Sequence, residues 1–276
     1  MRILLTLLVS LIGLSASAQV SFGQAEKFNT GWRFILRDDS AASKPDYDDS
    51  RWRPMELPHD WSVESAPSQE LASCTGYLPG GIGWYRKTFT VGDDAARHYI
   101  YFEGVYNRSD VYLNGHHLGH RPNGYVSFMY DLTPYLNKSG DNVIAVRVDH
   151  SRYADSRWYT GSGIYRDVYL ISAPDVHLSQ WGVAYRATRL TGRSATIEVD
   201  VAVDNHTTQA QEGAGTHHDA RCRRQEGSLC HQECQRGSQH HQLSIVNCEL
   251  SIKEPSPLEP RRPLPLHPAG GAPCRR

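Results

Sequence analysis

The chain contains 276 residues and has a formal net charge of −1. This length is enough for one large domain or two modest domains. A nearly neutral chain without a basic stripe lacks the electrostatic surface of a nucleic-acid-binding protein, so we expect no nucleic acid among its partners.

The N-terminal segment has the three parts of a secretory signal peptide. An apolar run at residues 3–14 follows Arg2 and precedes the small residues Ala16-Ser17-Ala18. Because a bilayer-spanning helix needs roughly 20 residues, this run is too short to cross a membrane comfortably. We therefore expect residues 1–18 to be cleaved, leaving an exported periplasmic or extracellular protein without a membrane segment. An uncleaved anchor is the alternative.

Cysteines are distributed unevenly along the chain. Cys74 is the only cysteine in the first two hundred residues, and the other five lie after residue 221. One early cysteine cannot form a disulfide framework, even in an oxidising compartment. We therefore expect a hydrophobic core to stabilise the main fold.

Short strand-like segments separated by polar loops follow the signal. Phe28–Phe34 is rich in aromatic residues, and Trp84–Val91 alternates between two faces. Between them, Trp52 and Trp61 are candidate core anchors, because large aromatic side chains bury much area. Pro54 lacks an amide donor, which predicts an edge strand at its position.

Residues 99–148 predict consecutive strands with one tight turn. Asn114-Gly115 suits a type I′ turn, in which both central residues have positive φ. A two-residue turn here predicts three cross-strand pairs: Leu113 with His116, Tyr112 with His117, and Val111 with Leu118. Residues 144–148 repeat the period of two, with Arg147 facing outward.

Asp131–Leu136 predicts a single helical turn, with Thr133 as the N-cap and Pro134 at the first helical position. Asp167–Ile171 is the expected last strand of this unit. Strands this frequent, separated by Gly, Pro and Asn and without a helical period, predict an all-β antiparallel sandwich.

A second strand pattern begins near residue 175. Val176–Tyr185 and Thr196–Val203 resemble the first two strands of another sandwich, and two strands alone are at best marginally stable. From about residue 210 the pattern ends, and no Phe, Trp or Tyr follows Tyr185. Only the fragment Leu243–Asn247 briefly resembles a strand again.

Three interpretations of residues 210–276 compete. The first is a disordered natural tail, because such a segment cannot offset its chain entropy by burial. The second is a metal site, although the cysteine spacing lacks the paired knuckles of structural zinc sites. The third, which we favour, is a frame-shifted translation, because hydrophobic patterning stops abruptly and Arg, Pro and Cys become frequent.

A histidine-rich segment precedes a polar, aromatic loop. Adjacent strand histidines point to opposite faces, so His116, His117 and His120 predict a solvated hairpin tip rather than a metal site. We predict no metal and no cofactor. The loop Arg121–Tyr125 is rich in hydrogen-bonding groups, and a sheet that holds such a loop rigidly suits a polyhydroxylated ligand.

Five segments form an ordered set of motifs. They are DDSRWRPMELPHDWSVE (48–64), GIGWYRKTF (81–89), FEGVYNRSDVYLNG (102–115), GYVSFMYDLTPYL (124–136) and SRWYTGSGIYRDVYL (156–170). In this order they resemble the N-terminal domain of glycoside hydrolase family 2, above all secreted bacterial β-galactosidases. The resemblance implies a jelly-roll, galactose-binding-like sandwich at 26–174 and the start of an immunoglobulin-like sandwich at 175–209.

In that family, two glutamates of a following (β/α)8 barrel perform the chemistry. Such a barrel needs ~250 residues, and only about a hundred follow Ile171. Glu103 and Glu198 match no catalytic motif of the family. The resemblance therefore implies no catalytic residue in this chain, a carbohydrate ligand such as a β-galactoside, and the catalytic barrel of the intact enzyme as partner.

The resemblance also implies contacts with the terminal sugar. The positions matching the family's sugar-contacting motifs are Arg121, Asn123, Asp155 and Trp158. The best-known version of the first motif has Asn where Arg121 stands, so the contact could come from Arg121, from Asn123 or from neither. A carboxylate and an amide suit vicinal hydroxyls, and an indole suits the apolar face of a sugar ring.

Structural roles for the same region are open. Arg157 and Asp167 could form an ion pair, and Trp158 and Tyr159 could be core or domain-interface aromatics. For the whole chain, the leading hypothesis is the N-terminal part of an exported β-galactosidase. A free-standing carbohydrate-binding module without hydrolase activity is the alternative.

Overall fold

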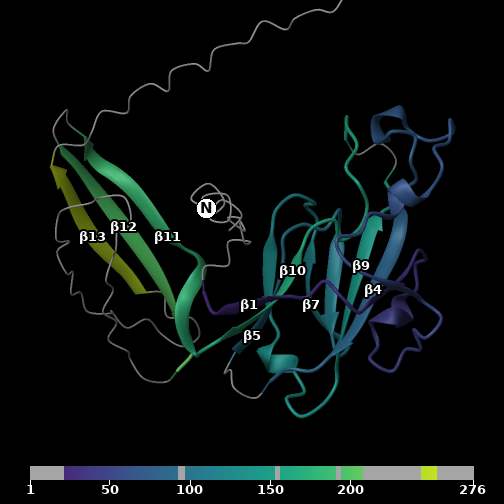
Figure 1. The fold of residues 1–276 in the computed structure, drawn as a ribbon, viewed down its shortest axis with the longest axis horizontal. Helices are drawn as coiled ribbons and strands as arrows, with labels where there is room; N and C mark the ends of the chain where they lie inside the picture. The colour runs from purple at the N-terminus through teal and green to yellow at the C-terminus, as the bar shows by residue number, and fades with distance from the viewer. Residues whose placement is uncertain (1–21, 93–96, 153–155, 191–193, 208–243, 254–276) are drawn as a thin grey trace, which may run out of the picture.

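The computed structural model describes residues 22–92, 97–152, 156–190, 194–207 and 244–253 (Figure 1). These residues form three antiparallel sheets, with short 3₁₀ turns in the connections. The all-β prediction is confirmed. The predicted signal peptide at residues 1–18 and the tail segments 208–243 and 254–276 lie outside the described residues.

Two of the sheets form the jelly-roll sandwich. The larger has the order β3 (Arg53–Met55), β2 (Trp32–Ile35), β4 (Gly81–Phe89), β9 (Asn142–His150), β6 (Ser109–Leu113) and β7 (His116–Arg121). The smaller has the order β1 (Gln24–Lys27), β10 (Val168–Ala173), β5 (Arg97–Phe102) and β8 (Phe128–Asp131). Pro54 lies in the edge strand β3, as predicted.

The core lies between these two sheets, because each strand turns alternate side chains inward. Phe102 of β5 stacks on Phe128 of β8 with 5.0 Å between ring centroids. Trp61 is also in this core and is fully buried, which confirms its predicted role as an anchor. The alternation correctly predicts the inward residues Val111, Leu113, Ile144, Val146 and Val148, all of which are buried.

The outer face of the larger sheet is covered by the polar loop that contains η1 (Ser40–Ser43). Trp84 of β4 packs there with Trp52 and Ala42 in a second apolar cluster. Arg86, also on β4, is buried beside them and donates to the Asp49 carboxylate at 2.9 Å. Its other nitrogens donate to the carbonyl oxygens of residues 42, 44, 45 and 47. One guanidinium thus fastens the whole loop to the sheet.

The β6–β7 hairpin follows the prediction at its tip and departs from it further along. Asn114 and Gly115 have φ values of 50° and 84°, as a type I′ turn requires. The predicted pairs of Leu113 with His116 and of Tyr112 with His117 are present. The third predicted pair is wrong, because a bulge moves Val111 opposite Gly119 instead of Leu118.

The bulge also changes where the histidines of β7 point. His117 and His120 both contact Oδ1 of Asp110 at 3.0 Å, whereas His116 stacks on the ring of Tyr135. In a regular strand, residues three apart would face opposite sides. No group of three His, Cys, Asp or Glu side chains suited to a metal ion is found among the described residues.

The predicted helical turn is present as η4 (Thr133–Tyr135). Its predicted cap is wrong, because Asp131 accepts the Thr133 amide at 2.9 Å and acts in place of the Thr133 side chain. The Thr133 hydroxyl instead accepts the amide of His98 on β5 at 3.0 Å. Asp131 therefore ties the turn to the end of its own strand.

A third, smaller sheet follows the sandwich. The predicted strands are present as β11 (Val176–Leu190) and β12 (Ser194–Asn205), joined by β13 (Ser244–Lys253). β13 lies in the stretch for which the sequence predicts irregular structure, and it begins within the strand-like fragment 243–247. No helix in the described ranges is long and apolar enough to cross a membrane.

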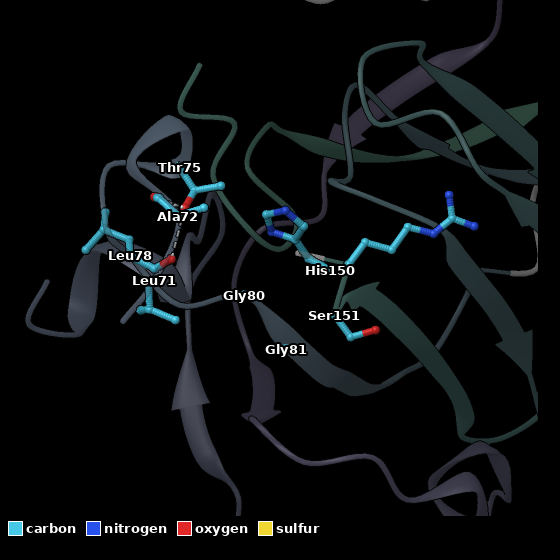
Figure 2. A pocket seen from close by; sticks show the side chains of 9 residues that line it. Leu71, Ala72, Thr75, Leu78, Gly80, Gly81, His150 and Ser151 are labelled. Carbon is cyan, nitrogen blue, oxygen red and sulfur yellow. Dashed lines mark hydrogen bonds between the residues drawn. The ribbon is translucent and has the colours of Figure 1, made fainter. Parts of the chain in front are cut away.

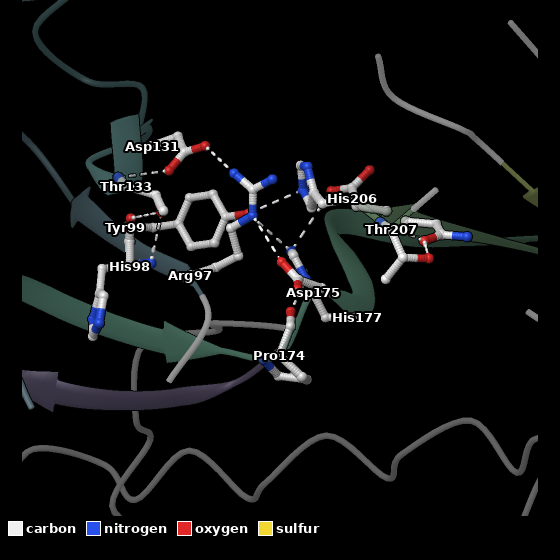
Figure 3. A network of polar contacts seen from close by, with 12 residues as sticks. Arg97, His98, Tyr99, Asp131, Thr133, Pro174, Asp175, His177, His206 and Thr207 are labelled. Carbon is white, nitrogen blue, oxygen red and sulfur yellow. Dashed lines mark hydrogen bonds and ion pairs between the residues drawn. The ribbon is translucent and has the colours of Figure 1, made fainter. Parts of the chain in front are cut away.

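A polar network joins β5 to β11 and to His206, the residue after β12 (Figure 3). The hydroxyl of Tyr99 lies 3.2 Å from His177 Nε2 and 3.3 Å from His206 Nε2. His177 Nδ1 donates to the Pro174 carbonyl at 2.8 Å, which orients the ring so that its Nε2 faces the Tyr99 hydroxyl. Burial, followed by the charges of Arg97 and His177, lowers the pKa of His206.

Candidate functional site

The loop after β7 is shaped by its own side chains. The Oδ1 atom of Asn123 accepts the amides of Tyr125 and Val126 at 2.8 and 3.2 Å. This is an Asx-type turn, in which a side-chain oxygen replaces a backbone acceptor. The Asn123 carbonyl is therefore used to hold the loop, and its amide nitrogen is the part suited to a ligand.

Gly124 fixes the same loop to the sandwich. It lies so close to the ring of Tyr106 that a Cβ atom would overlap the ring. The Gly124 carbonyl accepts the hydroxyl of Tyr165 at 2.8 Å. Only glycine allows this approach, because it has no Cβ atom. The loop is thus packed against Tyr106 and hydrogen-bonded to Tyr165.

An exposed aromatic surface forms where this loop meets the segment before β10. The Trp158 indole nitrogen donates to the Tyr125 hydroxyl at 2.9 Å, although the residues are 33 positions apart. Tyr125, Val126, Trp158 and Tyr159 are 50%, 58%, 60% and 42% exposed. We call these four residues the aromatic surface.

Asp60 attaches this surface to η2 (Trp61–Glu64). Its Oδ1 atom caps η2 by accepting the amide of Ser62 at 3.0 Å and also accepts the amide of Ser162 at 2.8 Å. Its Oδ2 atom accepts the Tyr159 hydroxyl. Burial, together with this hydrogen bond and the Asp60 charge, raises the pKa of Tyr159, which therefore stays neutral.

A pocket of about 240 Å³ lies beside β4 and β9 (Figure 2). It is lined by Leu71, Ala72, Thr75, Leu78, Gly80, Gly81, His150, Ser151 and Arg152. His150 Nδ1 lies 2.6 Å from the Ser162 hydroxyl, which in turn contacts Ser62 at 2.5 Å. The His150 ring packs edge-on against Tyr106, the residue that also supports Tyr125. The buried ring of Tyr106 therefore contacts both the pocket, through His150, and the aromatic surface, through Tyr125.

The carboxylates of η2 are committed to structural contacts. Glu64 pairs with Arg53 at 2.6 Å and with His59 Nε2 at 3.2 Å. The hydrogen bond from Arg53 is the largest cause of the lowered pKa of Glu64. A glycosidase general acid needs a raised pKa instead, so Glu64 is not suited to donate a proton.

The four predicted site residues have different environments. Trp158 is exposed in the aromatic surface, and Asn123 holds the neighbouring loop. Arg121 ends β7, and its guanidinium lies 5.7 Å from the centre of the Phe128 ring. Asp155 lies outside the described residues. The alternative pairing of Asp167 with Arg157 is not what the structure has, because Asp167 binds Lys27 at 2.9 Å.

Sequence reasoning missed Tyr125 and Asp60 as parts of this site. Tyr125 was within the loop singled out for its polar and aromatic character, but nothing local indicates a bond to Trp158. Asp60 directly precedes η2, which is the position of an N-cap, and this signal could have been used.

The chain matches known proteins over much of its length. The family model described as glycosyl hydrolases family 2, sugar binding domain, matches residues 25–174. A β-galactosidase of Bacteroides ovatus is 45% identical over 197 residues, covering 70% of this chain and 23% of that protein. A putative β-glucuronidase of Formosa agariphila is 40% identical over 64% of this chain and 17% of its own length.

Solved structures agree with the sequence matches. A β-glycosidase from Bacteroides vulgatus superposes with a TM-score of 0.68 and 37% identity, covering 85% of this chain and 30% of that one. The chain thus spans less than a third of each of these relatives. Since the family model covers more than half of its residues, the chain belongs to glycosyl hydrolases family 2 and comprises its N-terminal sugar binding domain.

Proposed function

We propose that this chain is the N-terminal part of an exported β-galactosidase of glycosyl hydrolases family 2. In this role it supplies a carbohydrate-binding surface and contacts to a catalytic barrel that lies elsewhere in the intact enzyme. The 45% identity to a β-galactosidase over 197 residues, with only 23% of that protein covered, supports the proposal.

The aromatic surface is the observation that carries the proposal. Monomeric proteins bury most large aromatic side chains, yet Trp158 and Tyr125 are each at least half exposed and are joined to one another. Aromatic rings of this kind pack on the apolar face of a sugar, and the Asn123 amide nitrogen beside them suits a sugar hydroxyl. Such a surface binds a terminal β-glycoside.

The chemistry is assigned to the barrel. A retaining glycosidase needs two carboxyl groups roughly 5 Å apart, one of them with a raised pKa. Asp60, which accepts the Tyr159 hydroxyl, and Glu64 of the adjoining η2 are both held by structural hydrogen bonds. We therefore expect the isolated chain to bind sugar without hydrolysing it.

Two measurements on the full chain test the proposal. Incubation with 4-nitrophenyl β-galactoside is expected to release no nitrophenol, and turnover abolished by substitutions in this chain would contradict the division of roles. Saturation-transfer NMR with millimolar methyl β-galactoside is expected to detect binding that Trp158→Ala removes. Trp181→Ala is the matched control, because Trp181 is 58% exposed but lies on β11.

The affinity measured in the same titration distinguishes the proposed function from the alternative, a free-standing carbohydrate-binding module. A free-standing carbohydrate-binding module must bind its sugar without help from a barrel. Its Kd should therefore lie well below about 1 mM, which corresponds to a binding free energy more favourable than about −4.1 kcal/mol. A surface that forms one wall of a larger pocket binds more weakly. The exposure of the Trp158 and Tyr125 rings in the aromatic surface favours the second behaviour.

A further inference from the structure

The hydrogen bond between Trp158 and Tyr125 has a defined direction. An indole nitrogen can only donate, so the Tyr125 oxygen is the acceptor at 2.9 Å. Within the described part of the chain, Trp158 is the hydrogen-bond partner of the Tyr125 hydroxyl. The hydroxyl proton of Tyr125 is therefore available to an incoming acceptor, while the Trp158 nitrogen is already used.

Tyr125 is held in place from behind. Its ring packs edge-on against Tyr106 at 5.4 Å, and Tyr106 is only 4% exposed. The Asn123 side chain accepts the Tyr125 amide, and the adjacent Gly124 packs on the Tyr106 ring. The ring, the backbone amide and the hydroxyl oxygen of Tyr125 are therefore each held by a contact. The hydroxyl group, which can donate its proton, is thus held in place beside the exposed Trp158 indole.

We propose that Tyr125 is a specificity-determining residue of the aromatic surface. It fixes the orientation of the Trp158 indole and donates its hydroxyl proton to an oxygen of the pyranoside that packs on that indole. This inference rests on the proposed function, and it adds a residue that selects ligands carrying a hydrogen-bond acceptor at the edge of the stacked ring.

The variant Tyr125→Phe tests the inference without removing the ring contact to Tyr106. Tyr135→Phe is the matched control, because Tyr135 is 42% exposed and lies near the opposite end of β7. Both variants are made in a Trp181→Phe background. The other four tryptophans are at most 4% exposed, so Trp158 then dominates quenching by acrylamide.

Two measured quantities are expected to change in Tyr125→Phe relative to the Trp181→Phe background protein. Neither is expected to change in the Tyr135→Phe control. Acrylamide quenching of Trp158 increases, because the indole loses its fixed partner. The affinity for methyl β-galactoside falls roughly 2- to 12-fold, the effect of one lost neutral hydrogen bond. Thermal unfolding stays unchanged, which excludes a general structural effect.

The outcomes separate the two proposals. If the parent protein binds sugar and Tyr125→Phe binds it equally well with unchanged quenching, the role of Tyr125 is refuted and the carbohydrate surface stands. If the parent protein itself gives a flat titration, the proposed function is refuted, and the role of Tyr125 in selecting sugar is refuted with it.

Discussion

Replacing the buried Arg86 is expected to destabilise the sandwich strongly. Its side chain is 2% exposed and binds Asp49 together with several loop carbonyls. In Arg86→Met the apolar stem is retained, but the Asp49 carboxylate loses its closest cation and the carbonyls lose their donor. Breaking a buried ion pair in this way costs about 3–5 kcal/mol, a large part of the roughly 5–15 kcal/mol that stabilises a typical domain.

Arg33→Met provides a control at the same carboxylate. Arg33 also contacts Asp49, at 3.6 Å, but its side chain is 42% exposed. Exposed ion pairs contribute about 0–1 kcal/mol, because water screens them and the side chain loses entropy. The two variants therefore share a carboxylate partner, but Arg86 is buried and binds more loop carbonyls than Arg33 does.

Urea unfolding followed by tryptophan fluorescence measures both variants, with linear extrapolation to water. Trp84 and Trp52 pack beside the loop, so their emission reports on its attachment. We expect a loss of at least about 3 kcal/mol for Arg86→Met and less than about 1 kcal/mol for Arg33→Met. Equal losses in the two variants would refute the argument from burial.

Three further predictions concern other parts of the fold. The pKa of His206 lies below its ordinary 6.5, so the unfolded chain takes up the proton first and stability falls as the pH drops below about 6.5. Urea unfolding at pH 7.5 and 5.5 should show a smaller loss in His206→Gln, and an identical loss would contradict this. Burial lowers the pKa of Lys87 to about 8, and its ammonium lies over the Phe28 ring. NMR of methyl-labelled lysines should give a midpoint near pH 8, and an ordinary value near 10.5 would exclude this burial. Gly124→Ala should cost about 1–3 kcal/mol by overpacking against Tyr106, measured by urea unfolding, and a neutral result would show that the loop can move away.

Local sequence chemistry was enough to predict several strands and the inward residues of β6 and β9. Period-two alternation in residues 144–148 and the Asn114-Gly115 turn act over a few residues, so they are visible without a fold. The predicted hairpin register failed at Val111, because a bulge places Gly119 instead of Leu118 opposite it, and a contact outside the hairpin accompanies this bulge. Gly119 lies against the ring of Tyr130 on β8, and any Cβ there would overlap it.

The candidate site was predictable only in part. Sequence motifs singled out Trp158 and the Arg121–Tyr125 loop separately, but the bond between Trp158 and Tyr125 joins residues 33 positions apart. No periodic pattern encodes such a contact. It depends on Gly124 packing on Tyr106 and on Asp60 holding the segment that contains Tyr159.

By itself, the sequence determined the all-β class, the inward residues of β6 and β9 and the family motifs, because each of these depends on neighbours along the chain. The tertiary structure alone decided that Arg86 fastens the outer loop, that His117 and His120 share Asp110, and that two exposed rings meet in one surface. These features depend on how separate strands pack, and packing is a property of the whole sandwich rather than of any one segment.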